Sequence, residues 1–277
     1  MKIISKNKIK ELTILSQKVR KDILQMVTAS KSSHIGSAFS MVEIIVVLYK
    51  LILKNDRVNP KDPERDRFLL SKGHACTALY SLLAELGYFE KELLKEFTKD
   101  GGILMSHINS EVSGVEFSTG SLGHALPVGL GIALAAKNRN EKWRTFVLLS
   151  DGELNEGSNW EAFLMAPQLK LSSLIVIVDS NTLQGLGFAK DIINMDPLDK
   201  KFEAFGWNVE IVDDGHDFVK IFNSVQKLIT VKSDKPSIVI ANTIKGKGIS
   251  FMENKLSWHY KSPSEEEYKL ALQELEK

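Results

Sequence analysis

The sequence contains a single cysteine, Cys76, so no disulfide forms within the chain. One thiol in 277 residues is typical of a reducing compartment, and we expect a cytoplasmic protein. The longest apolar stretch, residues 44–53, is interrupted by Lys50, whereas a helix that spans a membrane needs about 20 apolar residues. Charged residues run through the first 21 positions, which therefore lack the apolar core of a signal peptide. We expect no association with a membrane.

The sequence also lacks an excess of either charge, because 36 Lys and Arg are balanced by 35 Asp and Glu. The basic residues are scattered, which excludes the charged surface typical of proteins that bind nucleic acids. No strand-like segment leads into Gly-x-Gly-x-x-Gly, so the motif of nicotinamide cofactor binding is missing too. An apolar content of 43% and a charged content of 26% are ordinary for a globular protein.

What is present is an alternation of apolar, β-branched segments with helical patterns. Strands are predicted at residues 68–70, 145–149, 174–178, 208–212 and 238–241. Helices are predicted at residues 9–28, 41–53, 75–86 and 126–137, with others starting near 158 and 218. This alternation predicts an α/β fold with a mostly parallel sheet and helices on both faces.

The chain shows no internal repeat and no linker, which indicates one domain over residues 1–277. Ser264 precedes Glu267 by three residues, a capping box that predicts a C-terminal tail helix from about residue 263. Residues 97–122 lack periodicity, and an irregular stretch of this length is usually functional or disordered.

Polar residues follow two of the predicted strands. Asp151 and Gly152 come after the strand at 145–149, and Asn181 comes after the strand at 174–178. A right-handed crossover brings the two following loops to the same edge of a parallel sheet, where ligands bind. A carboxylate, an amide oxygen and a backbone carbonyl are donors that Mg²⁺ or Ca²⁺ prefers. Each residue alone also fits a turn or a helix cap, but the pair favours a metal-bound phosphate.

Residues 151–162 read Asp-Gly-Glu-Leu-Asn-Glu-Gly-Ser-Asn-Trp-Glu-Ala and are followed by Asn181. This pattern resembles the thiamine diphosphate motif, in the form found in transketolases. Further segments that resemble this family are residues 33–36, 66–74, 119–123, 202–207 and 214–217. The resemblance covers almost the whole chain. It departs from the family where Ser121 replaces a proline, Ser150 a glycine and His124 a common glutamine.

The resemblance implies roles for individual residues. It implies thiamine diphosphate as cofactor, with Mg²⁺ or Ca²⁺ bound by Asp151, Asn181 and the backbone carbonyl of Leu183. The residues that contact the cofactor would be His74, Gly120, Leu122, Asp151, Gly152, Glu153, Asn181 and His259. The residues that serve catalysis would be His34, His74, His107, His259 and Glu156. His34 and His107 would line the substrate channel, and Glu156 would join a carboxylate network between two active sites.

In transketolases a glutamate of a second domain activates the cofactor, and the sequence has no counterpart of that domain. We therefore expect one subunit of a split transketolase, active with a partner subunit that carries the pyrimidine-binding and C-terminal domains. The resemblance implies transfer of a two-carbon ketol unit from a ketose or ketose phosphate to an aldose, in a heterotetramer of two plus two chains.

Other interpretations remain open at this point. One is a 1-deoxyxylulose-5-phosphate synthase, which Leu-Ser-Lys-Gly-His at residues 70–74 disfavours. Another is the alpha subunit of a 2-oxo-acid dehydrogenase, which the early histidine loops disfavour. A third is a cofactor-binding subunit without turnover, against which the retained histidines weigh. The sequence does not reveal which sugar is used.

Overall fold

Five parallel strands form one sheet in the computed structural model, which describes residues 4–277. Residues 1–3 of the predicted domain lie outside the described residues. The strands occur in the order β1-β2-β3-β5-β4, and every neighbouring pair is parallel. Their bounds are β1 Arg67–Leu70, β2 Thr145–Ser150, β3 Leu174–Ser180, β4 Asn208–Val212 and β5 Ser237–Asn242.

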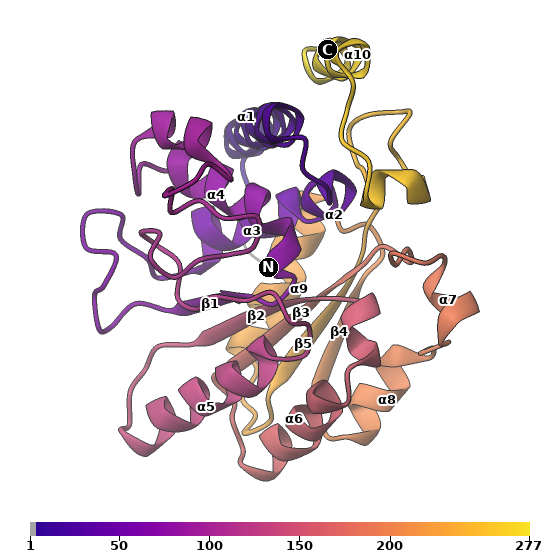
Figure 1. The fold of residues 1–277 in the computed structure, drawn as a ribbon. Coiled ribbons are helices and arrows are strands. Elements are labelled where there is room, and N and C mark those ends of the chain that lie inside the picture. The colour runs from indigo at the N-terminus through magenta and orange to yellow at the C-terminus, as the bar shows by residue number, and fades with distance from the viewer. Residues whose placement is uncertain (1–3) are drawn as a thin grey trace.

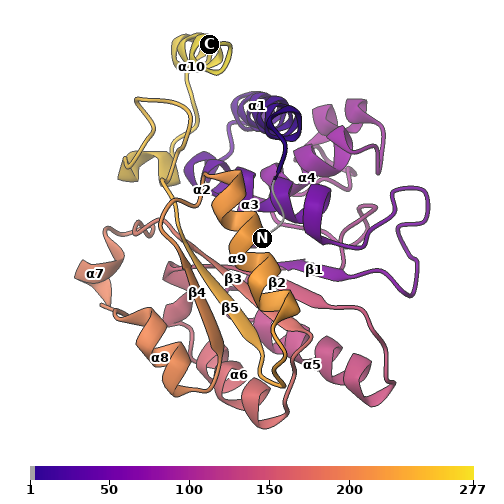
Figure 2. The ribbon, with the colours of Figure 1, turned by 180° about the vertical axis from the view of Figure 1, so that it is seen from behind.

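Helices cover both faces of this sheet (Figure 1). On one face lie α1 Lys6–Ser30, α2 Ile35–Ser40, α3 Val42–Val47, α4 Cys76–Glu85 and α9 Phe218–Thr230. On the other lie α5 Ala125–Asn138, α6 Gly157–Gln168 and α8 Leu198–Ala204, as the view from behind also shows (Figure 2). The short α7, Ala189–Ile192, lies beyond the end of the sheet. The predicted α/β fold with helices on both faces is confirmed.

The sheet separates two apolar cores, and the strands contribute alternate residues to each. Phe146 and Leu148 of β2 join the core beneath α1, α3 and α4, whereas Val147 and Leu149 join the core beneath α5 and α6. All six residues of β2 are buried. Burial on both faces explains the continuous apolar runs in the sequence, which are typical of central parallel strands.

The helix predicted over residues 41–53 is present at residues 42–52, but helical structure starts earlier than predicted and is not one regular helix. The structure has α2, then α3, then a π-helical turn η1 at Leu48–Ile52, so helical structure starts at Ile35. Serines and a glycine at residues 36–40 resemble a loop in sequence. The whole of α2 and α3 is nevertheless buried, and tertiary packing overrides weak local propensity. Gly36 leaves little room for a larger residue, because a Cβ there would lie 3.1 Å from the Lys245 side chain.

The C-terminal helix α10, Glu265–Leu275, starts with the predicted capping box. The Glu267 backbone N–H donates to the Ser264 hydroxyl at 3.2 Å, and the Ser264 N–H donates to the Glu267 carboxylate at 2.9 Å. The helix packs beside α1 (Figure 1), with Ala271 and Leu275 in the same core as Leu12 of α1. Over residues 4–277, no helix combines the length and the apolar character needed to cross a membrane.

Candidate functional site

The carboxyl ends of the strands surround a cavity of about 300 Å³. Every predicted site residue except Glu156 lines it: His34, His74, His107, Gly120, Leu122, Asp151, Gly152, Glu153, Asn181, Leu183 and His259. These residues come from loops spread over more than 200 positions of the chain. Residues that the sequence did not single out also line it: Ser37, Ser150, Gln184, Gly185, Lys245 and Tyr260.

The loops after β2 and β3 meet at Asp151, as expected from the crossover between the strands. One carboxylate oxygen of Asp151 accepts a hydrogen bond from the Gly152 N–H at 2.7 Å, and the other accepts from the Thr182 N–H at 2.5 Å. Burial, and next the charge of Asp179, raise the pKa of Asp151 to about 6. A nearby cation stabilises the ionised form of such a buried carboxylate.

The oxygens beside Asp151 suit a hard divalent cation. The Asn181 side-chain oxygen accepts from the Leu183 N–H at 3.2 Å, and the Leu183 carbonyl accepts from the Lys245 ammonium at 2.8 Å. Among the described residues, no three His, Cys, Asp or Glu side chains are grouped to bind a metal. The predicted site requires only one carboxylate, because an amide, a carbonyl, phosphate oxygens and water supply the other ligands.

Glu153 connects three segments at the cavity wall. Its side chain is fully buried, and one carboxylate oxygen accepts hydrogen bonds from the Gly123 N–H at 2.8 Å and from the Ser71 hydroxyl. The other oxygen accepts from the Ser150 N–H at 3.3 Å. These bonds connect the ends of β1 and β2 with the glycine loop that precedes α5.

Three of the predicted histidines gather on one side of the cavity. The ring centroid of His34 lies 4.9 Å from that of His74 and 5.1 Å from that of His259. His34 has a left-handed backbone with φ of 72°, and its N–H donates to the His259 carbonyl at 2.9 Å. A strained non-glycine backbone that persists in a fold often marks a functional position.

The three imidazoles share an electropositive, buried setting. Burial, followed by the charge of His107, lowers the pKa of His34 to about 4. Burial, followed by the charge of Lys245, lowers the pKa of His259 to about 3. Burial and the charge of Lys72 lower the pKa of His74 well below its usual range. Each ring is therefore neutral near pH 7, with one nitrogen that donates and one that accepts.

The irregular segment over residues 97–122 reaches the cavity through His107, Gly120 and Leu122. The Tyr80 hydroxyl fixes this segment, since it donates to the His107 carbonyl at 3.0 Å and accepts from the Asn109 N–H at 2.9 Å. A Cβ on Gly120 would meet the His107 ring at 3.4 Å. The lack of periodicity in this segment therefore reflects a loop that lines the site.

Glu156 and His124 lie outside the cavity. Glu156 is exposed at the N-cap of α6 and its side chain makes no capping hydrogen bond. Its predicted role, in a carboxylate network between two active sites, stays a prediction. His124 is exposed at the N-cap of α5. His216 also lies outside the cavity, and its Nδ1 is 2.8 Å from a Glu43 carboxylate oxygen.

Two buried lysines are the main features that sequence reasoning missed. Lys72 pairs with Asp179 below the cavity, and Lys245 contacts His259 Nδ1 at 2.7 Å. Burial and the charge of Lys72 lower the pKa of Lys245 to about 8. Each lysine follows closely on the carboxyl end of a buried strand, β1 or β5, and that position was the available signal.

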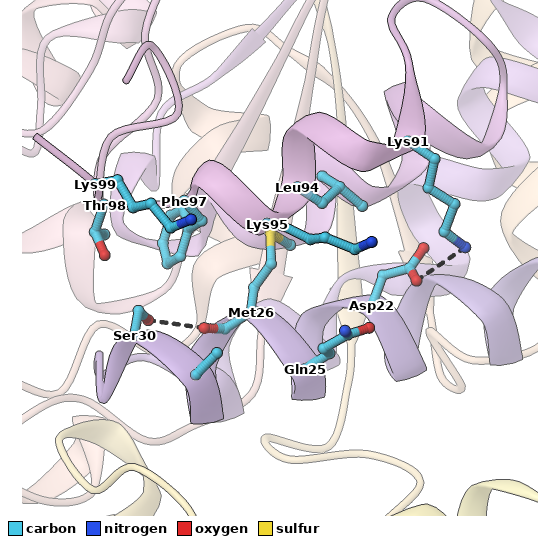
Figure 3. A pocket seen from close by; sticks show the side chains of 11 residues that line it. Asp22, Gln25, Met26, Ser30, Lys91, Leu94, Lys95, Phe97, Thr98 and Lys99 are labelled. Atoms are coloured by element: carbon cyan, nitrogen blue, oxygen red, sulfur yellow. Dashed lines mark hydrogen bonds and ion pairs between the residues drawn. The ribbon is translucent and has the colours of Figure 1, made fainter. Parts of the chain in front are cut away.

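A second cavity, of about 230 Å³, lies between α1 and the 3₁₀-helical segment η3, Lys91–Glu96 (Figure 3). Asp22 borders it and pairs with Lys91 at 2.9 Å. None of the predicted site residues lines this cavity.

Comparison with known proteins assigns the chain to a family. The family model described as "Transketolase, thiamine diphosphate binding domain" matches residues 13–275. The chain is 44% identical over 257 residues to one subunit of the apulose-4-phosphate transketolase of Actinobacillus succinogenes, covering 92% of each chain. It is 39% identical over 260 residues to a 6-deoxy-6-sulfo-D-fructose transketolase subunit of a Clostridium species, covering 94% of each.

Solved transketolases have the same fold. The transketolase of Campylobacter jejuni matches with a TM-score of 0.90 and 31% identity, over 100% of this chain but 43% of that chain. The transketolase of Leishmania mexicana matches with a TM-score of 0.89 and 29% identity, over 96% of this chain and 41% of that one. The present chain thus spans about two fifths of these solved proteins.

Proposed function

This chain belongs to the transketolase family, of which it has the thiamine diphosphate binding domain, and we propose that it is the cofactor-holding subunit of a two-subunit transketolase. One observation carries the proposal: Asp151, Asn181 and Leu183 line the same cavity as four histidines. Support for two subunits comes from the relatives whose names describe them as single subunits of a transketolase, which this chain matches over nearly their full length.

The residues on the phosphate side fit a magnesium-bound diphosphate. Asp151, Asn181 and the Leu183 carbonyl would bind Mg²⁺, or Ca²⁺ in its place, since all three offer hard oxygen donors. His74, Gly120, Leu122, Gly152 and Glu153 would border the cofactor, and His259 would contact it beside Lys245. When bound, thiamine diphosphate supplies the electron sink for breaking a carbon–carbon bond beside a ketose carbonyl.

The histidines on the open side of the cavity fit a sugar rich in hydroxyl groups. His34 and His107 would donate hydrogen bonds to the donor's hydroxyls and carbonyl oxygen, because an imidazole ring presents at least one N–H. A neutral imidazole next to a reacting hydroxyl can also accept its proton, as general acid–base catalysis requires. Glu156, exposed on α6, would meet its counterpart across a subunit interface.

A partner subunit would supply the cofactor-activating groups, in a heterotetramer of two plus two chains within the reducing cytoplasm. The donor would be a ketose or a ketose phosphate. The relatives' names point to two different donors, apulose 4-phosphate and 6-deoxy-6-sulfo-D-fructose. Both therefore belong in a substrate screen.

The test is to purify the tagged chain from its native cells, identify the polypeptide that copurifies, and assay ketol transfer with both donors. We expect transfer by the two chains together and none by either chain alone. Robust transfer by this chain alone would refute the two-subunit proposal. Cofactor binding without transfer, even with the copurified partner, would identify a subunit without turnover.

A further inference from the structure

Arg20, Glu43 and His216 form a buried polar cluster behind the loop that carries Lys245. Arg20 of α1 donates to both carboxylate oxygens of Glu43 of α3, at 2.5 and 2.8 Å. His216 Nδ1 lies 2.8 Å from Glu43 Oε2. The three side chains are at most 9% exposed. Burial raises the pKa of Glu43, but the charge of Arg20 and the hydrogen bonds from Arg20 and His216 outweigh it and lower the pKa to about 2.

The cluster holds the backbone on both sides of Lys245. The Ile244 N–H donates to His216 Nε2 at 2.8 Å, and Arg20 Nε donates to the Lys247 carbonyl at 2.9 Å. Because Nε2 accepts, the ring proton is on Nδ1, which donates to Glu43. Glu43 therefore fixes both the tautomer and the orientation of the ring, as carboxylates do for histidines behind metal sites.

From this fixed backbone the Lys245 side chain reaches the cavity. Lys245 is 1% exposed, and its ammonium donates to the Leu183 carbonyl at 2.8 Å and lies 2.7 Å from His259 Nδ1. The turn after it is tight, since Gly246 has a φ of +81° and a Cβ there would overlap the Met252 carbonyl oxygen. A small shift of this loop would move Lys245 away from both partners.

We propose that Arg20, Glu43 and His216 are positioning residues that place Lys245 against the Leu183 carbonyl and His259, and so set the affinity for magnesium thiamine diphosphate. This inference rests on the proposed function. None of the three residues lines the cavity, so they act through Lys245. Substitutions behind a metal site typically weaken its affinity by about 10- to 100-fold.

The test compares two substitutions of His216 in the complex with the partner subunit. His216→Leu removes both hydrogen bonds, whereas His216→Gln keeps one donor and one acceptor. Calorimetric titration with thiamine diphosphate in Mg²⁺ should give a Kd about tenfold higher for the Leu variant, with the Gln variant near wild type. Arg65→Gln is the matched control, because Arg65 pairs with Glu116 at 2.6 Å away from the cavity. It should lower stability and leave the Kd unchanged.

A double-mutant cycle with Lys245→Met tests the route of the effect. In the Lys245→Met background, His216→Leu should weaken binding no further. The inference is overturned if His216→Leu weakens binding as much in the Lys245→Met background as in wild type. It is also overturned if folded His216→Leu has an unchanged Kd. In both cases the proposed function stands. A wild-type complex that does not bind the cofactor overturns the proposed function and the inference with it. If His216→Leu does not fold, Arg20→Lys replaces it, because one ammonium does not reproduce the paired hydrogen bonds of the guanidinium to Glu43.

Discussion

Lys72 and Asp179 form an ion pair in which neither side chain is exposed to solvent. Lys72 follows β1 and Asp179 lies near the end of β3, so the pair connects two strands that are not neighbours. The Ser40 hydroxyl also donates to Asp179, at 2.6 Å. Burial raises the pKa of Asp179, but the charge and hydrogen bond of Lys72 outweigh it, and the pKa falls below its ordinary value. The carboxylate therefore stays ionised beneath the phosphate side of the cavity.

Removal of the ammonium should destabilise the fold. Lys72→Met leaves the Asp179 charge buried and unpaired, which costs about 3–5 kcal/mol of unfolding free energy. The double variant Lys72→Met/Asp179→Asn removes both charges and should recover part of that loss. Denaturant titration measures both. A single variant within about 1 kcal/mol of wild type, well under the range for a broken buried pair, would show that the pair does little for stability.

Gly73→Ala should disturb the cavity wall. A Cβ at this position would overlap the Thr119 hydroxyl oxygen and lie 2.5 Å from the Thr119 carbonyl oxygen, so the Thr119–Leu122 loop must move. A displacement of about 1 Å near reacting groups can cost about 100-fold in rate. We expect kcat/KM of the two-subunit enzyme to fall by at least about tenfold, because the loop should be displaced by less than the distance that costs about 100-fold.

Gly131→Ala is the matched control for this prediction. Gly131 lies within α5 and a Cβ there would meet nothing within 4 Å. Alanine in an open helical position should stabilise the chain by about 0.5–1 kcal/mol, with kcat/KM unchanged. Equal activities of the two alanine variants would contradict the account of the Gly73–Thr119 contact.

The cavity histidines should resist protonation. The pKa of His34 is lowered to about 4 and that of His259 to about 3, so both rings stay neutral from pH 5.5 to 8. Because unfolded histidine has a pKa of about 6.5, their contribution to stability is present above that pH and is lost as the pH falls through the folded values. NMR titration of ring-labelled histidine should show their signals unmoved over this range. A midpoint near 6.5 for either ring would contradict the prediction.

Asp22, at the second cavity, should make stability depend on pH in the opposite direction (Figure 3). Burial, and also the charge of Glu85, raise its pKa to about 6 in spite of the Lys91 partner. A raised pKa means that the contribution to stability is present below the unfolded pKa of about 3.9 and is lost as the pH rises through 6.

Replacement of Asp22 by asparagine should remove that dependence. Asp22→Asn should match wild type near pH 4 and exceed it above pH 6. The gain should be about 1 kcal/mol, because the Lys91 partner is exposed and solvent screens its interaction with the buried Asp22 carboxylate. Such a difference raises Tm by about 2–4 °C in a chain of this size. Thermal unfolding at pH 4, 5, 6 and 8 measures it, and a constant offset across that series would contradict the assignment to Asp22.

Buried strands and their order along the chain could be predicted because central parallel strands are apolar at every position. The prediction for residues 145–149 falls one residue short of the buried β2. That for residues 208–212 matches β4, an edge strand in which apolar residues alternate with polar ones. The helix α2 could not be predicted, because Gly36 and Ser40 resemble loop residues until the burial around them is known. Packing against Lys245 and Trp258, which are distant in sequence, decides their structure.

The site also contains residues that could be predicted from the sequence and residues that could not. Asp151 and Asn181 could be found because each directly follows a strand, and the strand pairing brings the loops together. Lys72 and Lys245 also follow strands closely, but the burial that distinguishes them from surface lysines arises only when several loops pack together. The closeness of His34 to His259 likewise depends on a hydrogen bond between backbones more than 200 residues apart.

The most direct test is calorimetric titration of thiamine diphosphate into this chain with its partner subunit, with Mg²⁺ and with excess EDTA. We expect tight binding only with Mg²⁺, and loss of that metal-dependent binding in Asp151→Ala, because the carboxylate is the one charged side chain among the proposed ligands of the cation. Binding that is equally tight in EDTA, or unchanged affinity in Asp151→Ala, would contradict the assignment of this site.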